Sequence, residues 1–275
     1  MQYRKDDTVT RYSFGSLREM GEYIATAPKT WGANYSVDES LSQTLNATYD
    51  DAVRMARLGW LDGAKNAAHA LKAFAPATPA PDTVRDICGF RPHVPAFCAG
   101  APDSMIRHAK RADTGAGRVL TLAVPVNASA ATSAQAMSNF GLGVAQYVNQ
   151  LEADGVRVEL IACIVSTVSG VRVAHAWTVK KADQPIDLAV VSFAIGHPAA
   201  FRRLGFALRE RCSAAEDPGY GYSLDAVPAD FINAPAGLVI LNGMKDADRH
   251  AQTPQKALAY VTTQIDKALA AQWGG

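Results

Sequence analysis

The residues that decide the fold begin at position 118 with the sequence RVLTLAVPVNASAATS, which runs to position 133. The first part, residues 118–124, is apolar on both faces, as is typical of a central parallel strand. Small and polar residues then form a loop, and residues 133–154 place apolar side chains at helical spacing. The segment therefore predicts a buried strand, a loop and a long amphipathic helix, in that order.

Two further apolar segments, residues 156–165 and 171–180, follow this helix and are joined by a short Ser-Gly turn. Such a tight connection joins antiparallel neighbours, so the two segments predict a β-hairpin. Much later in the chain, residues 237–241 form a last apolar strand that ends on an Asn-Gly pair.

Together these elements predict a three-layer α/β domain with a Rossmann-like mixed sheet of at least four strands and helices on both faces. One strand of this sheet, residues 171–180, is expected to be antiparallel to its neighbour. The alternative is a plain Rossmann-like sheet in which residues 156–165 and 171–180 do not pair.

Composition divides the chain into three regions. Residues 1–75 carry helical patterns and predict a helical N-terminal extension over one side of the sheet, in which Ser16 caps a helix over residues 17–27. Residues 76–117 are rich in proline and glycine and predict a linker and an arm. Residues 118–275 are expected to form the α/β domain itself.

The chain has an ordinary globular composition, with 48% hydrophobic and 19% charged residues. Its 27 basic and 26 acidic residues leave a net charge of +1, so no overall attraction to nucleic acid or to an acidic membrane is indicated. The charged N-terminus lacks the apolar core of a secretory signal, and no apolar run is long enough to span a membrane. We therefore expect a cytoplasmic protein, in which Cys163 is a buried reduced thiol.

Three short motifs fall near the ends of the predicted elements: Asn127-Ala-Ser129-Ala-Ala, Gly-His197-Pro and Asn242-Gly. The element order and these motifs resemble the von Willebrand factor A family, whose sheet also contains one antiparallel strand. In that family the corresponding positions carry Asp-x-Ser-x-Ser, a threonine loop and Asp-Gly, which together coordinate magnesium. The resemblance covers residues 118–270, and the overall pattern also looks like uncharacterised proteins carried by phages and other mobile elements.

The sequence departs from the family at the metal ligands. Asn127 and Asn242 stand where the family has aspartates, Ala131 replaces a serine, and His197 replaces the threonine. Magnesium requires anionic oxygen ligands in near-octahedral geometry. We therefore expect no metal and no cofactor here, and we expect that changing both asparagines to aspartate would create ion binding.

The polar residues nevertheless fall where an open α/β sheet presents its ligand face. We expect Asn127, Ser129, His197 and Asn242 to converge in one pocket. The full predicted ligand- or partner-binding set is Asn127, Ser129, Thr132, His197, Arg202, Arg203 and Asn242. The alternative is that this cluster is a satisfied hydrogen-bonding network that caps the strand ends.

The function implied by the resemblance is a non-catalytic protein-interaction module with a degenerate loop face and a protein partner. A first alternative is nucleic-acid binding or processing through the basic surfaces 107–118 and 202–211, because clustered arginines can follow phosphates. A second alternative is a hydrolase centred on Ser129 and His197. The sequence contains no Gly-x-Ser-x-Gly nucleophile motif, so no catalytic residue is assigned.

Overall fold

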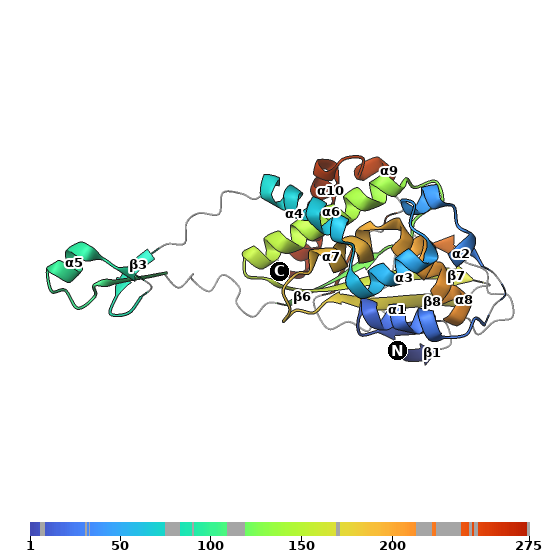
Figure 1. The fold of residues 1–275 in the computed structure, drawn as a ribbon, viewed down its shortest axis with the longest axis horizontal. Coiled ribbons are helices and arrows are strands. Elements are labelled where there is room, and N and C mark those ends of the chain that lie inside the picture. The colour runs from blue at the N-terminus through green and yellow to red at the C-terminus, as the bar shows by residue number, and fades with distance from the viewer. Residues whose placement is uncertain are drawn as a thin grey trace.

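The structure is a computed structural model that describes residues 1–5, 9–30, 32, 34–74, 83–89, 91–108, 119–168, 171–212, 222–223, 238–241, 244 and 247–273. Within these residues a mixed sheet packs against a layer of helices (Figure 1). A second, three-stranded sheet forms a small separate unit. The chain is thus a mixed α/β protein, as the sequence predicts.

The main sheet runs in the order β1-β2-β8-β7-β6-β10, and a short strand β9 pairs with β7 beyond the end of β6. The bounds are β1 (Gln2–Lys5), β2 (Val9–Phe14), β6 (Val119–Pro125), β7 (Arg157–Val168), β8 (Val171–Lys180), β9 (Tyr222–Ser223) and β10 (Leu238–Ile240). β6 is parallel to both β7 and β10, whereas β7 and β8 are antiparallel. The predicted hairpin is confirmed, and the alternative sheet without it is wrong.

Helix α6 (Ala134–Ala153) connects β6 to β7 where the sequence predicts a helix. The Ser133 hydroxyl accepts the backbone N–H of Ala136 at 3.1 Å and so caps the first turn. Further along, α6 crosses another helical segment so closely that a Cβ added at Gly141 would lie 2.2 Å from the Cα of Gly196. The absence of a side chain at Gly141 is therefore what permits this contact.

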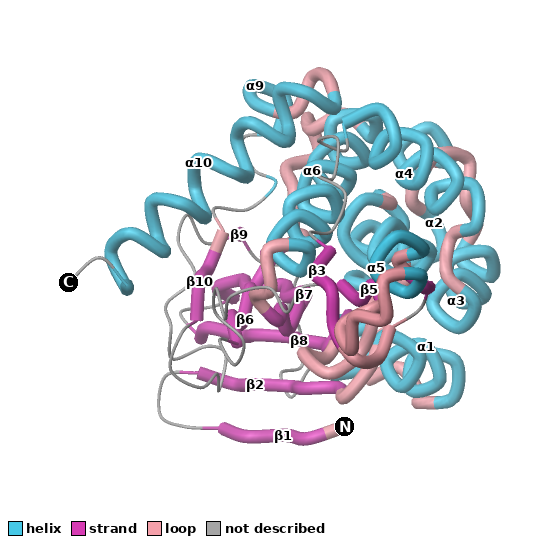
Figure 2. Tube along the Cα trace, turned by 90° about the vertical axis from the view of Figure 1, so that its left-hand side faces the viewer, coloured by secondary structure: helices cyan, strands magenta, loops and turns pink. Residues whose placement is uncertain are grey.

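The other helices of the main body are α1 (Leu17–Thr26), α2 (Tyr35–Asp38), η1 (Leu41–Thr44), α3 (Tyr49–Leu58), α4 (Leu61–Phe74), α7 (Leu188–Val191), the π-helical turns η2 (Ser192–Gly196) and η3 (Ala200–Gly205), α8 (Phe206–Cys212), α9 (Ala247–His250) and α10 (Pro254–Trp273). Figure 2 shows these described helices gathered on one face of the sheet. The main core lies between the two layers, where Leu122, Leu160 and Trp177 of the strands meet Phe140 of α6 and Ile265 of α10.

The opposite face of the sheet carries a second apolar cluster. Its described members all come from strands, and Ala123, Cys163 and Val165 among them have no exposed surface. The described residues therefore form two layers, and the helices predicted for this second face are not among them. Strands that are apolar on both faces indicate burial on both faces, and the described strand residues are buried on both.

The N-terminal region contains strands that the sequence does not predict. β2 lies parallel to β8 inside the main sheet, with Tyr12 opposite His175 and Phe14 opposite Trp177. Residues 1–74 and 119–273 therefore share one sheet, and the N-terminal region is more than a helical extension laid over it. The predicted helix after Ser16 is confirmed as α1, and the Ser16 hydroxyl accepts the N–H of Glu19 at 3.0 Å.

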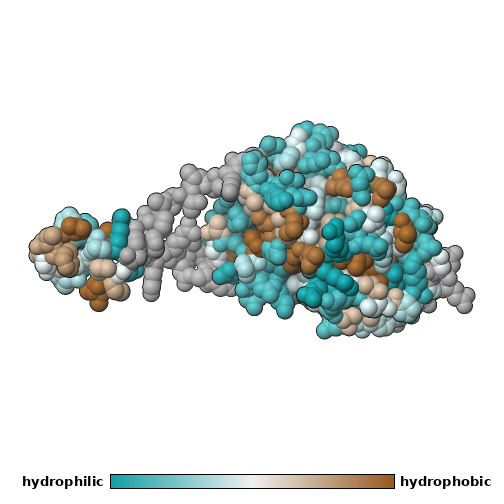
Figure 3. All heavy atoms as spheres, viewed as in Figure 1, coloured by the Kyte–Doolittle hydropathy of each residue, from teal (hydrophilic) through white to brown (hydrophobic). Residues whose placement is uncertain are grey.

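Residues 83–89 and 91–108 fall in the region predicted as a linker and arm. They form β3 (Thr83–Asp86), β4 (Arg91–Pro92), α5 (Val94–Cys98) and β5 (Met105–His108), with strand order β3-β5-β4. Figure 3 shows apolar residues on the surface of this unit, and Ile87 and Phe97 are 75% and 66% exposed. The sequence gives no periodic signal for this small sheet.

None of the described helices is both long enough and apolar enough to cross a membrane. The described cysteines are all free thiols, and Cys163 is buried as predicted. Burial raises the pKa of the Cys163 thiol to about 12, because a thiolate would lose its hydration there. This cysteine is therefore an inert part of the core.

Candidate functional site

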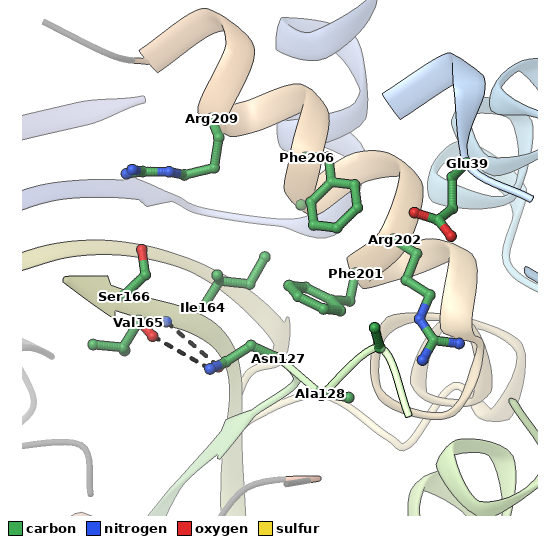
Figure 4. A pocket seen from close by; sticks show the side chains of 12 residues that line it. Glu39, Asn127, Ala128, Ile164, Val165, Ser166, Phe201, Arg202, Phe206 and Arg209 are labelled. Atoms are coloured by element: carbon green, nitrogen blue, oxygen red, sulfur yellow. Dashed lines mark hydrogen bonds between the residues drawn. The ribbon is translucent and has the colours of Figure 1, made fainter. Parts of the chain in front are cut away.

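A pocket of about 180 Å³ lies where β6 and β7 reach their carboxyl ends, between these strands and η3 and α8 (Figure 4). Its lining combines apolar, polar and charged side chains, chiefly Ile164, Phe201, Phe206, Asn127, Ser166, Glu39, Arg202 and Arg209. The pocket therefore occupies the edge of the sheet at which the sequence predicts a site.

Asn127 extends the pairing of β6 with β7 beyond the last residue of β6. Its side-chain amide donates to the carbonyl of Val165 at 3.2 Å and accepts the N–H of Val165 at 3.5 Å. Both bonds are drawn in Figure 4. Asn127 therefore caps the strand end while one side of it lines the pocket, so the capping alternative describes this residue.

The loop after Asn127 is fixed by a buried arginine. Nη2 of Arg202 donates to the carbonyl of Ser129 at 3.0 Å and to that of Thr132 at 2.7 Å, and Nη1 donates to the carbonyl of Gln43 at 2.8 Å. The Ser129 hydroxyl accepts the N–H of Ala131 at 3.2 Å. Residues 129–131 are exposed, and the backbone of this loop is fixed by hydrogen bonds to the buried guanidinium of Arg202.

Arg203 lies outside the pocket lining and has a structural role. Its guanidinium donates to the carbonyls of Val37 at 2.7 Å, Ala47 at 3.2 Å and Ser36 at 3.3 Å. The residue is 1% exposed, and burial lowers the pKa of its guanidinium. Arg203 therefore joins η3 to the N-terminal helices, and the prediction that it contacts a ligand is wrong for this pocket.

His197 does not line the pocket either. Its Nδ1 accepts the backbone N–H of Ala199 at 3.1 Å, and its ring packs edge-on against Trp60 with 4.6 Å between the ring centroids. Burial lowers the pKa of His197 to about 4, so the imidazole is neutral at pH 7. The predicted convergence of His197 with Asn127 and Ser129 is therefore wrong, because the His197 ring packs against Trp60 and Phe193 within the helical layer.

The remaining predicted residues divide between the pocket and the rest of the chain. The structure brings Asn127 and Arg202 into the pocket lining, with Ser129 and Thr132 attached to it through their carbonyls. Asn242 lies outside the described residues, although the preceding N–H, that of Leu241, donates to Ala123 at 3.0 Å. The ladder between β6 and β10 thus continues to the residue before Asn242.

Two polar residues of the pocket, Ser166 and Arg209, are absent from the predicted site. Ser166 sits near the end of the apolar strand β7, and Arg209 belongs to an arginine cluster that normally indicates a solvated helix face. Both are 4% exposed. Ser166 and Arg209 come together because β7 pairs with β6 and α8 lies over the ends of these strands. No local spacing in the sequence predicts that they line one pocket.

The arginine-rich stretch 202–211 does not form an exposed basic surface. Arg202, Arg203 and Arg209 are buried, and Arg211 donates to the hydroxyl of Tyr49 at 3.1 Å. In the stretch 107–118, Arg107 forms an ion pair with Asp86, and residues 109–118 lie outside the described part of the chain. The prediction of a basic surface over residues 202–211 is therefore wrong, because these arginines point into the protein.

The described residues offer little metal or acyl-transfer chemistry. No three histidine, cysteine, aspartate or glutamate side chains within the described ranges lie close enough together to hold a metal ion. The imidazole of His197 and the hydroxyl of Ser129 each accept a backbone N–H of their own loop. The two groups that the hydrolase alternative would use as base and nucleophile are therefore each engaged with their own backbone.

Neither a search of curated proteins nor a search of solved structures gives a match to this chain. One family model, described as a domain of unknown function (DUF7192), matches residues 3–270. That match spans both the N-terminal strands and the carboxyl-terminal helix, in agreement with the single sheet that they share. The chain belongs to the DUF7192 family.

Proposed function

We propose that this protein is a non-catalytic interaction module that binds a partner protein at the loop face, which we define as residues 129–131 and the pocket below them. The observation that carries the proposal is the clamp of Arg202 on this loop. Residues 129–131 are exposed, whereas the carbonyl of the first of them, Ser129, and that of the following residue, Thr132, are fixed by a buried guanidinium. A loop that is ordered before binding loses less conformational entropy when a partner docks.

The strand order supports a von Willebrand factor A-like arrangement at this edge. β6 lies between two parallel neighbours, β7 and β10, and the antiparallel strand β8 follows β7 by a hairpin. The loop after β6 is the position at which open α/β sheets bind ligands. We extend the proposal to a member of that class without a functional metal site, carried by a phage or another mobile element.

The two alternative functions have less support. Nucleic-acid binding relied partly on residues 202–211, whose arginines are mostly buried and bonded to the protein itself. A hydrolase requires that His197 accept a proton from Ser129, but the Nδ1 of His197 accepts the N–H of Ala199 and its ring packs on Trp60. A binding role for the loop face needs neither an exposed basic surface nor a proton transfer between Ser129 and His197.

Photo-crosslinking in the native host cell tests the proposal. A benzoylphenylalanine placed at Ala131, which is exposed and next to the pocket lining but not part of it, is expected to form an adduct with one partner protein. The same probe at Leu58 is the control, because Leu58 is 70% exposed and lines a second hollow between α3 and α4.

The expected result is an adduct at position 131 that an excess of the unlabelled protein suppresses, and no such adduct at position 58. An adduct formed only from position 58 would place the interaction at the hollow between α3 and α4. That result would contradict the proposed loop face.

A further inference from the structure

We propose that the pocket of the loop face binds a carboxylate carried on a short apolar body, with the carboxylate between Ser166 and Arg209 and the body against Phe201 and Phe206. This inference rests on the proposed function, because it names the chemistry recognised at the same site. The carboxylate has two sources to consider, a free small acid and the C-terminal residue of a partner chain.

Ser166 is the observation that points to a ligand. Its side chain is 4% exposed and lines the pocket, and its Oγ has no hydrogen-bond partner among the described residues. Buried hydroxyl groups are nearly always hydrogen-bonded, and an unpaired one facing a cavity requires an explanation. An acceptor atom of a bound ligand would satisfy this hydroxyl.

The charged side chains of the pocket favour an anion at one end. Figure 4 shows Ser166 and Arg209 at one end of the pocket, Phe201 and Phe206 in the middle, and Glu39 with Arg202 toward the other end. A carboxylate beside Arg209 is thus attracted by a guanidinium and kept away from Glu39. A charge-assisted hydrogen bond from an arginine is about twice as strong as a neutral one.

The volume and the walls of the pocket limit the size of the ligand. The pocket measures about 180 Å³. A cavity of about 150 Å³ holds one benzene ring, whereas sites for drug-sized ligands begin at about 300 Å³. Ile164, Phe201 and Phe206 supply apolar walls, so one ring or branched side chain attached to a carboxylate fits this space.

Binding of phenylacetate to the full-length protein, measured by calorimetry, tests the inference. We expect a dissociation constant on the order of 1 mM or tighter, and at least about tenfold weaker binding of the neutral amide, 2-phenylacetamide. The second arm uses a peptide that ends in phenylalanine, with either a free or an amidated C-terminus. Binding of the free peptide terminus alone would identify the partner chain as the source.

Two variants assign the binding to this pocket. Ser166→Ala is expected to weaken carboxylate binding about tenfold while leaving the melting temperature unchanged or higher, because the hydroxyl has no hydrogen-bond partner to lose among the described residues. Ala130→Phe fills the mouth of the pocket at an exposed position and is expected to abolish binding. The control, Ser13→Ala, removes an exposed hydroxyl from β2 and should leave affinity unchanged.

Three results would overturn the inference. These are equal binding of acid and amide, no binding of either the small acid or the peptide, and binding that survives both pocket variants. Binding of phenylacetate without any crosslinked partner at position 131 would support the pocket chemistry and contradict the proposed protein-interaction function. The two proposals can therefore fail separately.

Discussion

The Nη2 of Arg202 lies 2.7 Å from the carbonyl oxygen of Thr132, so a helix side chain that lines the pocket also holds the loop after β6. The same guanidinium reaches the carbonyls of Ser129 and Gln43. One buried arginine therefore joins the β6–α6 loop, η3 and the turn at η1.

Removal of this clamp should release the loop. We expect Arg202→Met, which keeps the apolar length of the side chain, to lower the free energy of unfolding by about 3 kcal/mol, because three carbonyls lose a charged donor. Chemical denaturation measures the loss, and amide exchange should quicken at residues 129–132. Arg18→Met is the control, since the exposed Arg18–Glu22 pair should contribute less than about 1 kcal/mol.

The amide of Asn127 is needed as a donor. Nδ2 of Asn127 donates to the carbonyl of Val165, so an aspartate at this position would set a carboxylate oxygen against that carbonyl. We expect Asn127→Asp to destabilise the protein by about 2 kcal/mol at pH 7, measured by urea denaturation. A variant as stable as the wild type would show that the Asn127 bridge contributes little, and would favour the substitution of aspartate as a route to ion binding.

The two buried histidines, His175 and His197, should make the free energy of unfolding fall as the pH is lowered. Burial lowers the pKa of His197 from 6.5 to about 4, and that of the fully buried His175 shifts in the same direction. Above pH 6.5 both states hold neutral imidazoles and the contribution is fully present. Below it the unfolded chain takes up protons first, so the unfolding free energy should fall by up to about 1.4 kcal/mol per histidine for each pH unit, as far as pH 4 for His197.

The variant His197→Asn separates the two histidines. An asparagine oxygen can accept the N–H of Ala199 as Nδ1 does, but it does not titrate. Denaturation curves between pH 7 and pH 5 should therefore show a smaller loss of stability for this variant. An identical loss in both proteins would mean that His197 does not titrate as its burial implies.

The close contact between α6 and η2 should not tolerate a methyl group. A Cβ at position 141 would lie 2.2 Å from the Cα and 2.5 Å from the nitrogen of Gly196. We expect Gly141→Ala to cost at least about 3 kcal/mol, even though alanine favours the helical conformation by about 1 kcal/mol. Thermal unfolding should show this loss, whereas Gly32→Ala, whose added Cβ meets no described atom within 4 Å beyond its chain neighbours, should leave the transition within about 2 °C.

Local patterns predict the part of the fold that depends on neighbouring residues in the chain. The apolar run before Asn127, the cap at Ser133 and the short connection between β7 and β8 are visible in the sequence and are present in the structure. β2 is different, because it contains the charged Arg11 and becomes a strand through its pairing with β8. The strand propensity of the six residues of β2 does not indicate that they pair with β8, which lies more than 150 residues later in the chain.

The candidate site was predictable in position but not in composition. The edge of the sheet follows from topology, and Asn127 falls there because it comes two residues after the end of β6. The roles of the arginines do not follow, because Arg202 bonds to Gln43 and Arg203 to Val37, both more than 150 residues earlier. An arginine that satisfies distant carbonyls has the same local sequence as one that faces solvent.

The central claim is that a partner binds at the loop face, and the affinity of the crosslinked partner for purified variants tests it most directly. We predict that Ala130→Arg, at an exposed position on the rim of the pocket, weakens binding at least about tenfold. The exposed-site control Arg18→Ala should bind as tightly as the wild type. Equal affinities for all three proteins would contradict the account.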